Sequence, residues 1–321
     1  MNRPERPRIV VGYGRSGTTW VLDVLAQANS LRPVFEPMHP DAIPAAAPYA
    51  HKYLARNDRD DDLCELLNRY FDSYFHSIWA DYRIRTGWLK PRLRHLRSWP
   101  QAKAWVNRLN RSKTYYFRYR SQRLREERIV KLIRANMIIS WLRENMAARM
   151  VFIVRHPAAV VLSQAASPQS WDPYRRLNLY KSDSRLSNAM SSRMRALLSQ
   201  SLDSIEALTL AWCVENSIAF KQAAESDVPI IHYEDLLENG EAEWPRILAA
   251  LDLEIMPDSD LIARPSQQTW GEQAKDPALV RRYESWMTRI DPKTAEKIQA
   301  ILDEALVDVY NVTQALPVGR K

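Results

Sequence analysis

The stretch VVGYGRSGTTWVLD, residues 10–23, holds three of the chain's seven glycines within six positions. The apolar run at 9–11 predicts a buried strand, and Trp20, Val21 and Val24 recur at helical spacing after the glycines. A strand, a glycine turn and a helix N-terminus make an anion site, because unpaired backbone N–H groups and the helix dipole point to one place. The stretch therefore predicts a phosphate-binding loop within an α/β fold.

Three interpretations of this glycine loop follow from its spacing. A G-x-G-x-x-G pattern begins at Gly12, as in dinucleotide-binding proteins, and Glu36 lies near the distance expected of a ribose-binding acid. Gly12 and Gly17 also have the spacing of the nucleoside-triphosphate P-loop, but Thr18 stands where that loop needs its lysine. Arg15 adds a cation that a dinucleotide loop does not need, which favours a different phosphate ligand.

Apolar runs predict four further strands, at 31–35, 129–133, 150–154 and 229–232. A helical pattern at 135–146 separates two of them, and strands that alternate with helices indicate a parallel sheet. We therefore expect an α/β, P-loop-like three-layer fold with a central parallel sheet and a helical insertion. Glu36 follows the second strand, at the edge where open α/β sheets place their chemistry.

Length and composition fit one globular domain. The 321 residues are 46% hydrophobic, which is enough for a sizeable core. We expect a single domain over 1–321, in which 40–128 is a basic, aromatic-rich helical insertion that contacts the substrate. The segment 167–204 is rich in Ser, Asp, Asn and Arg with little apolar periodicity at first, which predicts a mobile lid.

The two cysteines argue against a disulfide framework and against a metal site. Cys64 and Cys213 stand far apart, with no C-x-x-C pair and no metal-ligand spacing. Residues 1–7 are polar and lack the apolar core of a signal peptide, and no later run approaches the roughly 18 apolar residues of a membrane span. These features predict a cytoplasmic protein that uses no metal.

Positive charge is concentrated in residues 83–134, which carry 17 Lys and Arg against two Glu, although the whole chain has a net charge of only +8. Such a block predicts an anionic partner: nucleic acid, an acidic membrane face or an acidic substrate. Trp and Tyr side chains are interleaved with the cations, which suits stacking on sugar rings or bases. We expect about half of this block to have no binding role and to form a solvated helical face with aromatic residues packed beneath it.

The loop GRSGTTW resembles the 5′-phosphosulfate loop of sulfotransferases, in which Lys or Arg precedes Ser-Gly-Thr-Thr. Downstream, FIVRHPAAVVLSQ at 152–164 is similar to the 3′-phosphate motif of the same family, in residue types and in the interval from Arg155 to Ser163. The resemblance implies the donor 3′-phosphoadenosine 5′-phosphosulfate. Two such motifs in the right order are far more specific than one.

Weaker matches agree with these two motifs. Tyr233, in IIHYEDLL, resembles a tyrosine near the adenine, and Lys131, in IVKLIR, resembles a lysine that meets the sulfuryl group. The catalytic His of the cytosolic branch is replaced by Ile133, whereas FEP at 35–37 resembles the carbohydrate branch, in which an acid after the second strand acts as base. The glycine-containing C-terminal loop is missing, and 263–266 is its expected substitute. The departures favour the carbohydrate or bacterial branch.

The resemblance implies a role for each matching residue. The catalytic residues would be Glu36 as general base, with His39 in reserve, and Arg15 and Lys131 on the sulfuryl and leaving oxygens. The donor would be held by Arg15, Ser16, Gly17, Thr18, Thr19, Trp20, Arg155, Ser163 and Tyr233.

The implied function is sulfuryl transfer to a hydroxyl of a carbohydrate, a glycolipid or another small molecule. The acceptor would bear hydroxyls and be anionic or glycosylated, the basic insertion would touch membrane surfaces, and no nucleic acid partner is expected. Two alternatives stay open. A polyanion- or RNA-binding protein on a P-loop-like scaffold would show steep salt dependence without cofactor dependence, and an NAD- or flavin-dependent enzyme would tolerate Arg15→Ala.

Overall fold

The computed structural model describes residues 6–40, 43–71, 75–77, 80–81, 125, 127–167, 171–264 and 283–319. Its centre is a five-stranded, all-parallel sheet in the order β2-β5-β1-β6-β7. The strands are β1 (Arg8–Gly12), β2 (Arg32–Phe35), β5 (Arg128–Leu132), β6 (Arg149–Val154) and β7 (Ile230–His232). The expected strands and their parallel arrangement are confirmed.

Strand β1 lies in the middle of the sheet, and all five of its residues are buried. Val10 pairs with Lys131 of β5 on one side, and Gly12 pairs with Ile153 of β6 on the other. Because all strands are parallel, their carboxyl ends meet at one edge, where the glycine loop, Glu36 and Lys131 come together.

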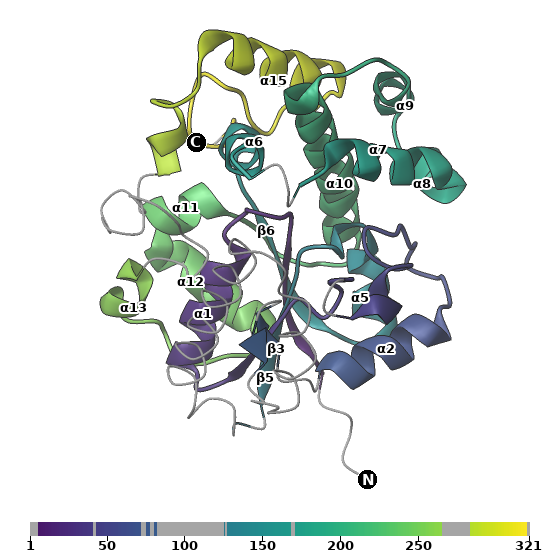
Figure 1. Ribbon diagram of the computed structural model, residues 1–321. Helices are drawn as coiled ribbons and strands as arrows, with labels where there is room; N and C mark the ends of the chain where they lie inside the picture. Colours follow the sequence, from purple (N-terminus) through teal and green to yellow (C-terminus); the bar gives the residue numbers. More distant parts are fainter. Residues whose placement is uncertain are drawn as a thin grey trace, which may run out of the picture.

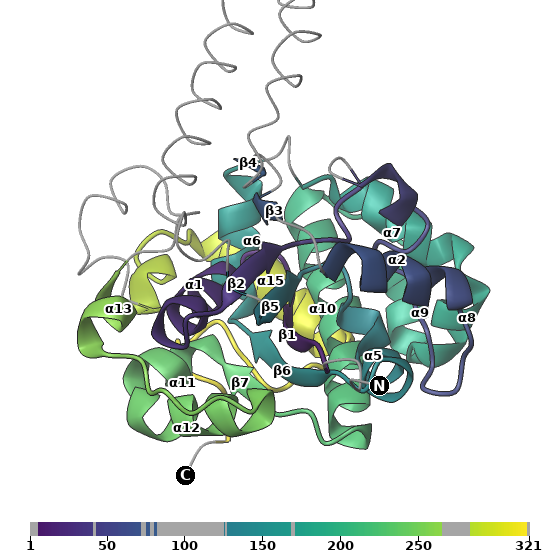
Figure 2. The ribbon, with the colours of Figure 1, turned by 90° about the horizontal axis from the view of Figure 1, so that it is seen from below.

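Side chains that alternate along each strand divide the core into two layers. Val10 and Ile153 pack with α1 (Thr18–Ala28), α11 (Tyr233–Glu238) and α12 (Gly240–Leu251). Val11 and Phe152 point the other way, to α5 (Ile139–Asn145), α6 (Pro157–Ala165) and α10 (Ser204–Glu225). Figures 1 and 2 show these helix groups on opposite sides of the sheet, which confirms the three-layer architecture.

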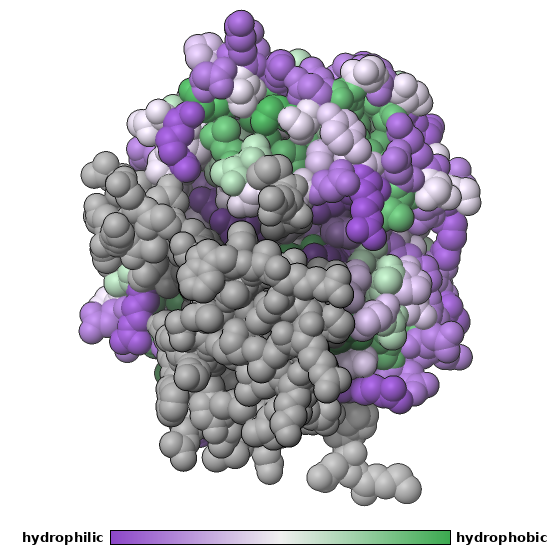
Figure 3. All heavy atoms as spheres, viewed as in Figure 1, coloured by the Kyte–Doolittle hydropathy of each residue, from purple (hydrophilic) through white to green (hydrophobic). Residues whose placement is uncertain are grey.

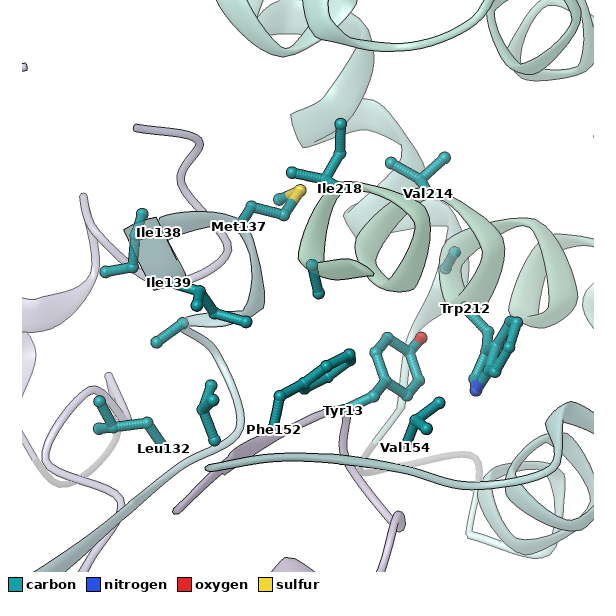
Figure 4. Close-up of a cluster of buried hydrophobic side chains, with 14 of the residues drawn as sticks. Tyr13, Leu132, Met137, Ile138, Ile139, Phe152, Val154, Trp212, Val214 and Ile218 are labelled. Atoms are coloured by element: carbon teal, nitrogen blue, oxygen red, sulfur yellow. The ribbon is translucent and has the colours of Figure 1, made fainter. Parts of the chain in front are cut away.

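The longest described helix, α10, forms the centre of the larger layer. Figure 4 shows Trp212 of α10 on the side of Val154 of β6, whereas Val214 and Ile218 project from the other side of α10, with Met137 beside Ile218. Helix α15 (Pro292–Glu304) packs along α10, and Met137 of the short helix η4 (Asn136–Ile138) lies in the same cluster. Two shorter elements, α13 (Ser259–Ala263) and η7 (Tyr283–Trp286), complete the C-terminal part.

The expected insertion at 40–128 is described only in part. It contains the short helix η1 (Pro44–Ala46), helix α2 (Asp61–Phe71), and the antiparallel strands β3 (Phe75–Ser77) and β4 (Ala80–Asp81). Buried Leu63 and Leu67 attach α2 to the main core. Of the basic block 83–134, only residues 125 and 127–134 are among the described residues, so the acceptor role expected for it lies outside them.

The described part of the segment expected to be a mobile lid, 171–204, is helical and not an irregular loop, and its mobility stays a prediction. Helices α7 (Pro173–Ser182), α8 (Ser184–Ala189) and α9 (Ser192–Leu198) follow one another there, and α7 packs against α10. Asp172, Asp183 and Ser191 cap their N-termini. The polar residues that resembled a loop thus include helix caps, and buried Leu177 and Tyr180 of α7 and Met194, Leu197 and Leu198 of α9 recur at helical spacing.

Among the described helices, none combines the length and the apolar character needed to cross a membrane. In the same part of the chain, no three His, Cys, Asp or Glu side chains gather in an arrangement that could hold a metal ion.

Candidate functional site

The loop between β1 and α1 needs its three glycines for close packing. A Cβ at Gly12 would lie 2.5 Å from the carbonyl oxygen of Ile153, and one at Gly14 would lie 2.2 Å from the Trp171 indole. Gly17 has φ +87°, and a Cβ there would lie 2.4 Å from the Tyr233 ring. Neither the space nor the backbone conformation suits another residue. The loop is therefore pressed between β6, Trp171 and Tyr233.

The loop ends at the N-terminus of α1, as the sequence predicted. Gly17 caps this helix without a side-chain hydrogen bond, so the amides of the first turn keep their free donors. Ser16 is fully buried, and its Oγ has no hydrogen-bond partner among the described residues. A buried hydroxyl without a partner is costly unless a ligand satisfies it, and donors of this kind fit a phosphate.

Two arginines meet beside this loop. The Nε of Arg15 donates to Ser163 Oγ at 2.8 Å, and the Nη1 of Arg155 donates to the Arg15 carbonyl oxygen at 3.2 Å. Burial and the charge of Arg155 lower the pKa of Arg15. Neither guanidinium forms an ion pair with a carboxylate among the described residues, and Arg155 Nε is buried without a partner. Two adjacent cations without a counter-charge are the arrangement expected of an anion site.

Tyr233 lies where the two predicted motifs meet. Its ring is 4.6 Å from the Arg155 guanidinium carbon and makes an edge contact with Trp20 at 5.8 Å. The structure thus brings together Arg15, Arg155 and Tyr233, residues from three distant segments that the sequence assigned to one ligand.

The C-terminal segment, which sequence reasoning missed, holds the Arg155 turn in place. Glu234 accepts a hydrogen bond from the His156 backbone N–H at 2.9 Å and another from Tyr310 Oη at 2.8 Å. The His156 ring stacks on Trp286 at 4.2 Å between centroids. Its Nδ1 accepts from the Ala158 N–H, which leaves Nε2 to donate to the Asn311 carbonyl at 2.9 Å. Burial lowers the pKa of His156 to about 4, so this ring is neutral.

Another cation from the C-terminal segment lies near Arg155. Arg289 donates from Nε to the Ser285 carbonyl at 2.9 Å, and partial burial together with the Arg155 charge lowers its pKa. No motif in the sequence marked it. Of the expected C-terminal substitute at 263–266, Arg264 is exposed and bonds to Gln27 at 3.4 Å, while Pro265 and Ser266 lie outside the described residues.

Lys131 and Glu36 form an ionic cluster at the carboxyl edge of the sheet. Lys131 Nζ is 3.4 Å from Thr19 Oγ1, 4.0 Å from Glu36 Oε2 and 3.5 Å from the Phe35 ring centroid. Burial lowers the pKa of Lys131 to about 8, against the opposing charge of Glu36. Lys131 is only 2% exposed, so its ammonium group is not solvated.

The carboxylate expected to act as base accepts a hydrogen bond on one oxygen, and its other oxygen has an ion-pair contact without a hydrogen bond among the described residues. Glu36 Oε2 accepts from the Ile133 N–H at 2.7 Å, and Oε1 lies 3.4 Å from Arg134 Nη1. The Glu36 side chain is fully buried. His39, the reserve, has a pKa lowered to about 3, chiefly by burial and then by Arg134 and Lys131.

Next to this cluster lies a buried network that no motif predicted. Glu215 Oε1 accepts from Tyr180 Oη at 2.5 Å, lies 2.8 Å from His51 Nδ1 and 3.9 Å from Arg176 Nη1. Arg176 in turn donates to the Tyr13 hydroxyl within the glycine loop. These residues come from four segments, so only the fold reveals them. A lone carboxylate in the otherwise apolar WCVEN stretch of α10 was the one available signal.

Three residues of the site have a left-handed backbone. Arg15 has φ +77°, Glu36 +51° and His51 +63°. For residues other than glycine this conformation is strained, and such strain gathers at functional sites. Five described residues outside the site share this conformation, namely Ser30, Ala147, Asp227, Asp252 and Leu306, so it does not by itself define the site.

Comparisons with known proteins identify the family of the chain. A model of the sulfotransferase family matches residues 7–258, a span that includes the glycine loop, Lys131, the Arg155 turn and Tyr233. Among solved structures, the chain is similar to the "Sulfotransferase Domain from the Curacin Biosynthetic Pathway", with 13% identity and a TM-score of 0.42 over 94% of this chain and 98% of that one. Comparison with curated protein sequences finds no match. On the family match, the chain belongs to the sulfotransferase family.

Proposed function

We propose that the chain transfers a sulfuryl group from 3′-phosphoadenosine 5′-phosphosulfate to a hydroxyl of a carbohydrate, a glycolipid or another small-molecule acceptor. The observation that carries this proposal is the adjacency of Arg15 and Arg155, two cations without a carboxylate partner among the described residues. They flank a glycine loop whose Ser16 hydroxyl is buried and unsatisfied. A donor with two separate phosphate groups matches this pair of cations.

The residues present fit such a donor. Ser16, Gly17, Thr18 and Thr19 would hold the 5′-phosphate through their hydroxyls and through the free amides of α1. Arg155 and Ser163 would hold the 3′-phosphate, because a guanidinium fork matches an oxyanion with two parallel hydrogen bonds. Tyr233 and Trp20 would line the adenine side, since their rings already contact each other beside Arg155.

When bound, the donor supplies an activated sulfuryl group, and the chain supplies position and charge. Arg15 and Lys131 would stabilise the negative charge that develops on the sulfuryl and leaving oxygens. Thr19 would orient Lys131 through its hydroxyl, 3.4 Å from the amine. Positioning and electrostatic stabilisation dominate related phosphoryl transfers and need no redox change.

Glu36 would keep its proposed role as a base through Oε1. Oε2 accepts from the Ile133 N–H and lies 4.0 Å from Lys131, whereas Oε1 lies 3.4 Å from Arg134 without a hydrogen bond among the described residues. The polyanion-binding alternative does not call for a buried Lys131 beside a phosphate loop.

The acceptor and the location of the protein remain proposals from the sequence. The basic, aromatic-rich block at 83–134 supports an anionic or glycosylated acceptor and contact with anionic membrane surfaces, with no nucleic acid as partner. Two unpaired cysteines support a reducing, cytoplasmic setting.

Transfer of labelled sulfate tests the proposed function. The protein would be incubated with [35S]-labelled donor and with saccharides, glycolipids and phenols, and labelled products would be separated. We expect transfer to at least one class, and a loss of at least about 100-fold in Arg15→Ala, the size seen when a donor to a developing oxyanion is removed. Arg69→Ala is the matched control, because Arg69 is exposed on α2 and, among the described residues, pairs only with Glu65. Equal transfer by Arg15→Ala would contradict the assignment of this cation.

A further inference from the structure

The network around Glu215 is a buried ionisable cluster that the donor site does not use. Glu215 lies on α10 and is fully buried, with Oε2 lacking a hydrogen-bond partner among the described residues. Burial acts to raise its pKa, but His51, Arg176 and the Tyr180 hydroxyl outweigh burial, so that the pKa is lowered. Glu215 is therefore an ionised carboxylate held inside the protein.

His51 is oriented by this carboxylate. Its Nδ1 lies 2.8 Å from Glu215 Oε1, and an ionised oxygen can only accept, so Nδ1 carries the proton. Nε2 then has a lone pair, and it has no hydrogen-bond partner in the described part of the chain. Burial lowers the pKa of His51 against the attraction of Glu215. The ring is therefore a neutral base with a fixed tautomer, as in His–carboxylate pairs that take up protons.

The imidazole lies beside the ionic cluster at the carboxyl edge of the sheet. The backbone N–H of His51 donates to the Arg134 carbonyl at 2.9 Å, and Arg134 is the residue that pairs with Glu36. The charges of Arg134, Lys131 and His51 all act to lower the pKa of His39, after the larger effect of burial. His39 therefore lies near all three side chains. The His51 side chain is 12% exposed, unlike the fully buried Glu36. Figure 3 shows a hollow with hydrophilic residues below the position of α6 and α7, the face on which these strand ends open.

We propose that His51, held by Glu215, is the catalytic base that receives the proton of the acceptor hydroxyl. This inference rests on the proposed function and deepens it. As the acceptor oxygen bonds to sulfur, the bond between sulfur and the 5′-phosphate oxygen breaks, and its electron pair stays on that oxygen. The hydroxyl proton passes to His51 Nε2, the resulting imidazolium is stabilised by Glu215, and the proton later leaves to solvent. Glu36 then positions Lys131 and Arg134.

The charged groups that face His51 determine its pH behaviour. They are Glu215 of α10, Arg176 of α7, Arg134 after β5 and His39 after β2. The two arginines oppose a charge on the imidazole, and Glu215 favours one. A base must be unprotonated to act, so the rate falls as pH drops through the pKa of His51. The acid limb should therefore lie below 6.5 in the donor-free enzyme.

Two variants separate the effect of losing His51 Nε2 from an effect on folding. His51→Asn suits the positive φ and places an amide N–H where Nδ1 stands, so the bond to Glu215 can persist while Nε2 is lost. Tyr174→Phe is the matched control, because Tyr174 is exposed on α7 and its hydroxyl donates to the Leu202 carbonyl, outside the Glu215 network. Thermal midpoints and the affinity for 3′-phosphoadenosine 5′-phosphate show whether each variant keeps its fold and donor site.

The activity test uses water as the acceptor. Single-turnover release of labelled sulfate from [35S]-labelled donor is measured from about pH 5 to about pH 9, a range that covers the acid and the alkaline limb of the pH–rate profile. We expect His51→Asn to lose at least about 100-fold and to lose the acid limb, at unchanged product affinity. Tyr174→Phe should stay within about fivefold of wild type and keep the acid limb. A rate for His51→Asn within about threefold of wild type overturns the proposal, as does wild type that binds product but releases sulfate no faster than buffer.

A spectroscopic test needs no donor. In [15N]histidine-labelled protein, the signal that disappears in His51→Asn should show a neutral ring above pH 6.5 with the proton on Nδ1. A proton on Nε2, or a charged ring at neutral pH, overturns the proposal that His51 and Glu215 act as the base, and it leaves the proposed function untouched. Failure of wild type to bind 3′-phosphoadenosine 5′-phosphate overturns the proposed function instead, so the two failures are distinguishable.

Discussion

Replacing Gly17 with alanine tests the close packing on which the donor site depends. Gly17 has φ +87° and ψ 0°, a conformation that costs an L-residue about 1–2 kcal/mol. The new Cβ would also lie 2.4 Å from two carbons of the Tyr233 ring, about 1 Å closer than ordinary contact. Tyr233 is 6% exposed and confined by Trp20 and Arg155, so the ring cannot easily turn away. Such overpacking adds about 1–3 kcal/mol, for a total of about 2–5 kcal/mol.

Urea unfolding measures this loss, and another glycine provides the control. Gly319 has φ +86°, but a Cβ there would meet nothing within 4 Å, so Gly319→Ala carries only the backbone part. We expect Gly17→Ala to lower the unfolding free energy more than Gly319→Ala does, at an unchanged m-value. In a Tyr233→Ala background, Gly17→Ala should lose no more than Gly319→Ala does. Two results would refute the packing argument. One is an equal loss of unfolding free energy for Gly17→Ala and Gly319→Ala in the wild-type protein. The other is a loss for Gly17→Ala that stays the same when Tyr233 is replaced.

Three further predictions concern single groups. For Lys131, whose pKa is lowered to about 8, the cation is lost as pH rises through that value, so kcat/KM for the donor should decline above pH 8, and Lys131→Arg should abolish the decline. Ser163→Ala removes the acceptor of the 2.8 Å bond from Arg15 and should weaken binding of 3′-phosphoadenosine 5′-phosphate by about tenfold in calorimetry; unchanged affinity would exclude Ser163 from the donor site. Tyr310→Phe deprives buried Glu234 of its 2.8 Å donor and should lower the unfolding free energy by about 1–3 kcal/mol in urea titrations, whereas a neutral effect would contradict the bracing role of the C-terminal segment.

The sheet and the donor loop could be predicted because their signals are local. Runs such as 150–154 are apolar on both faces, which predicts a buried strand. The glycines at 12 and 17 stand between a strand and a helix, where close packing leaves no room for a Cβ. The residues that pack against those glycines, Trp171 and Tyr233, could not be paired with them from sequence. Only Tyr233 was assigned to the site, and by resemblance.

The rest of the site depends on contacts between distant segments. His51 and Glu215 are 164 positions apart, and neither belongs to a motif. Glu36 was found by its place after a strand, but its contacts with Ile133 and Arg134 follow from the register of β2 on β5. The helices at 173–198 were missed because their caps resemble loop residues.

Calorimetric binding of 3′-phosphoadenosine 5′-phosphate to wild type and to Arg155→Ala tests the central claim most directly, with NADH and ATP as control ligands. We predict that wild type binds this product and that Arg155→Ala binds it at least about tenfold more weakly, because one charge-assisted hydrogen bond contributes about 1.5–3 kcal/mol. The control ligands should bind far more weakly than the product. No binding of the product to wild type, or equal binding of NADH, would contradict the account of this loop as a phosphosulfate site.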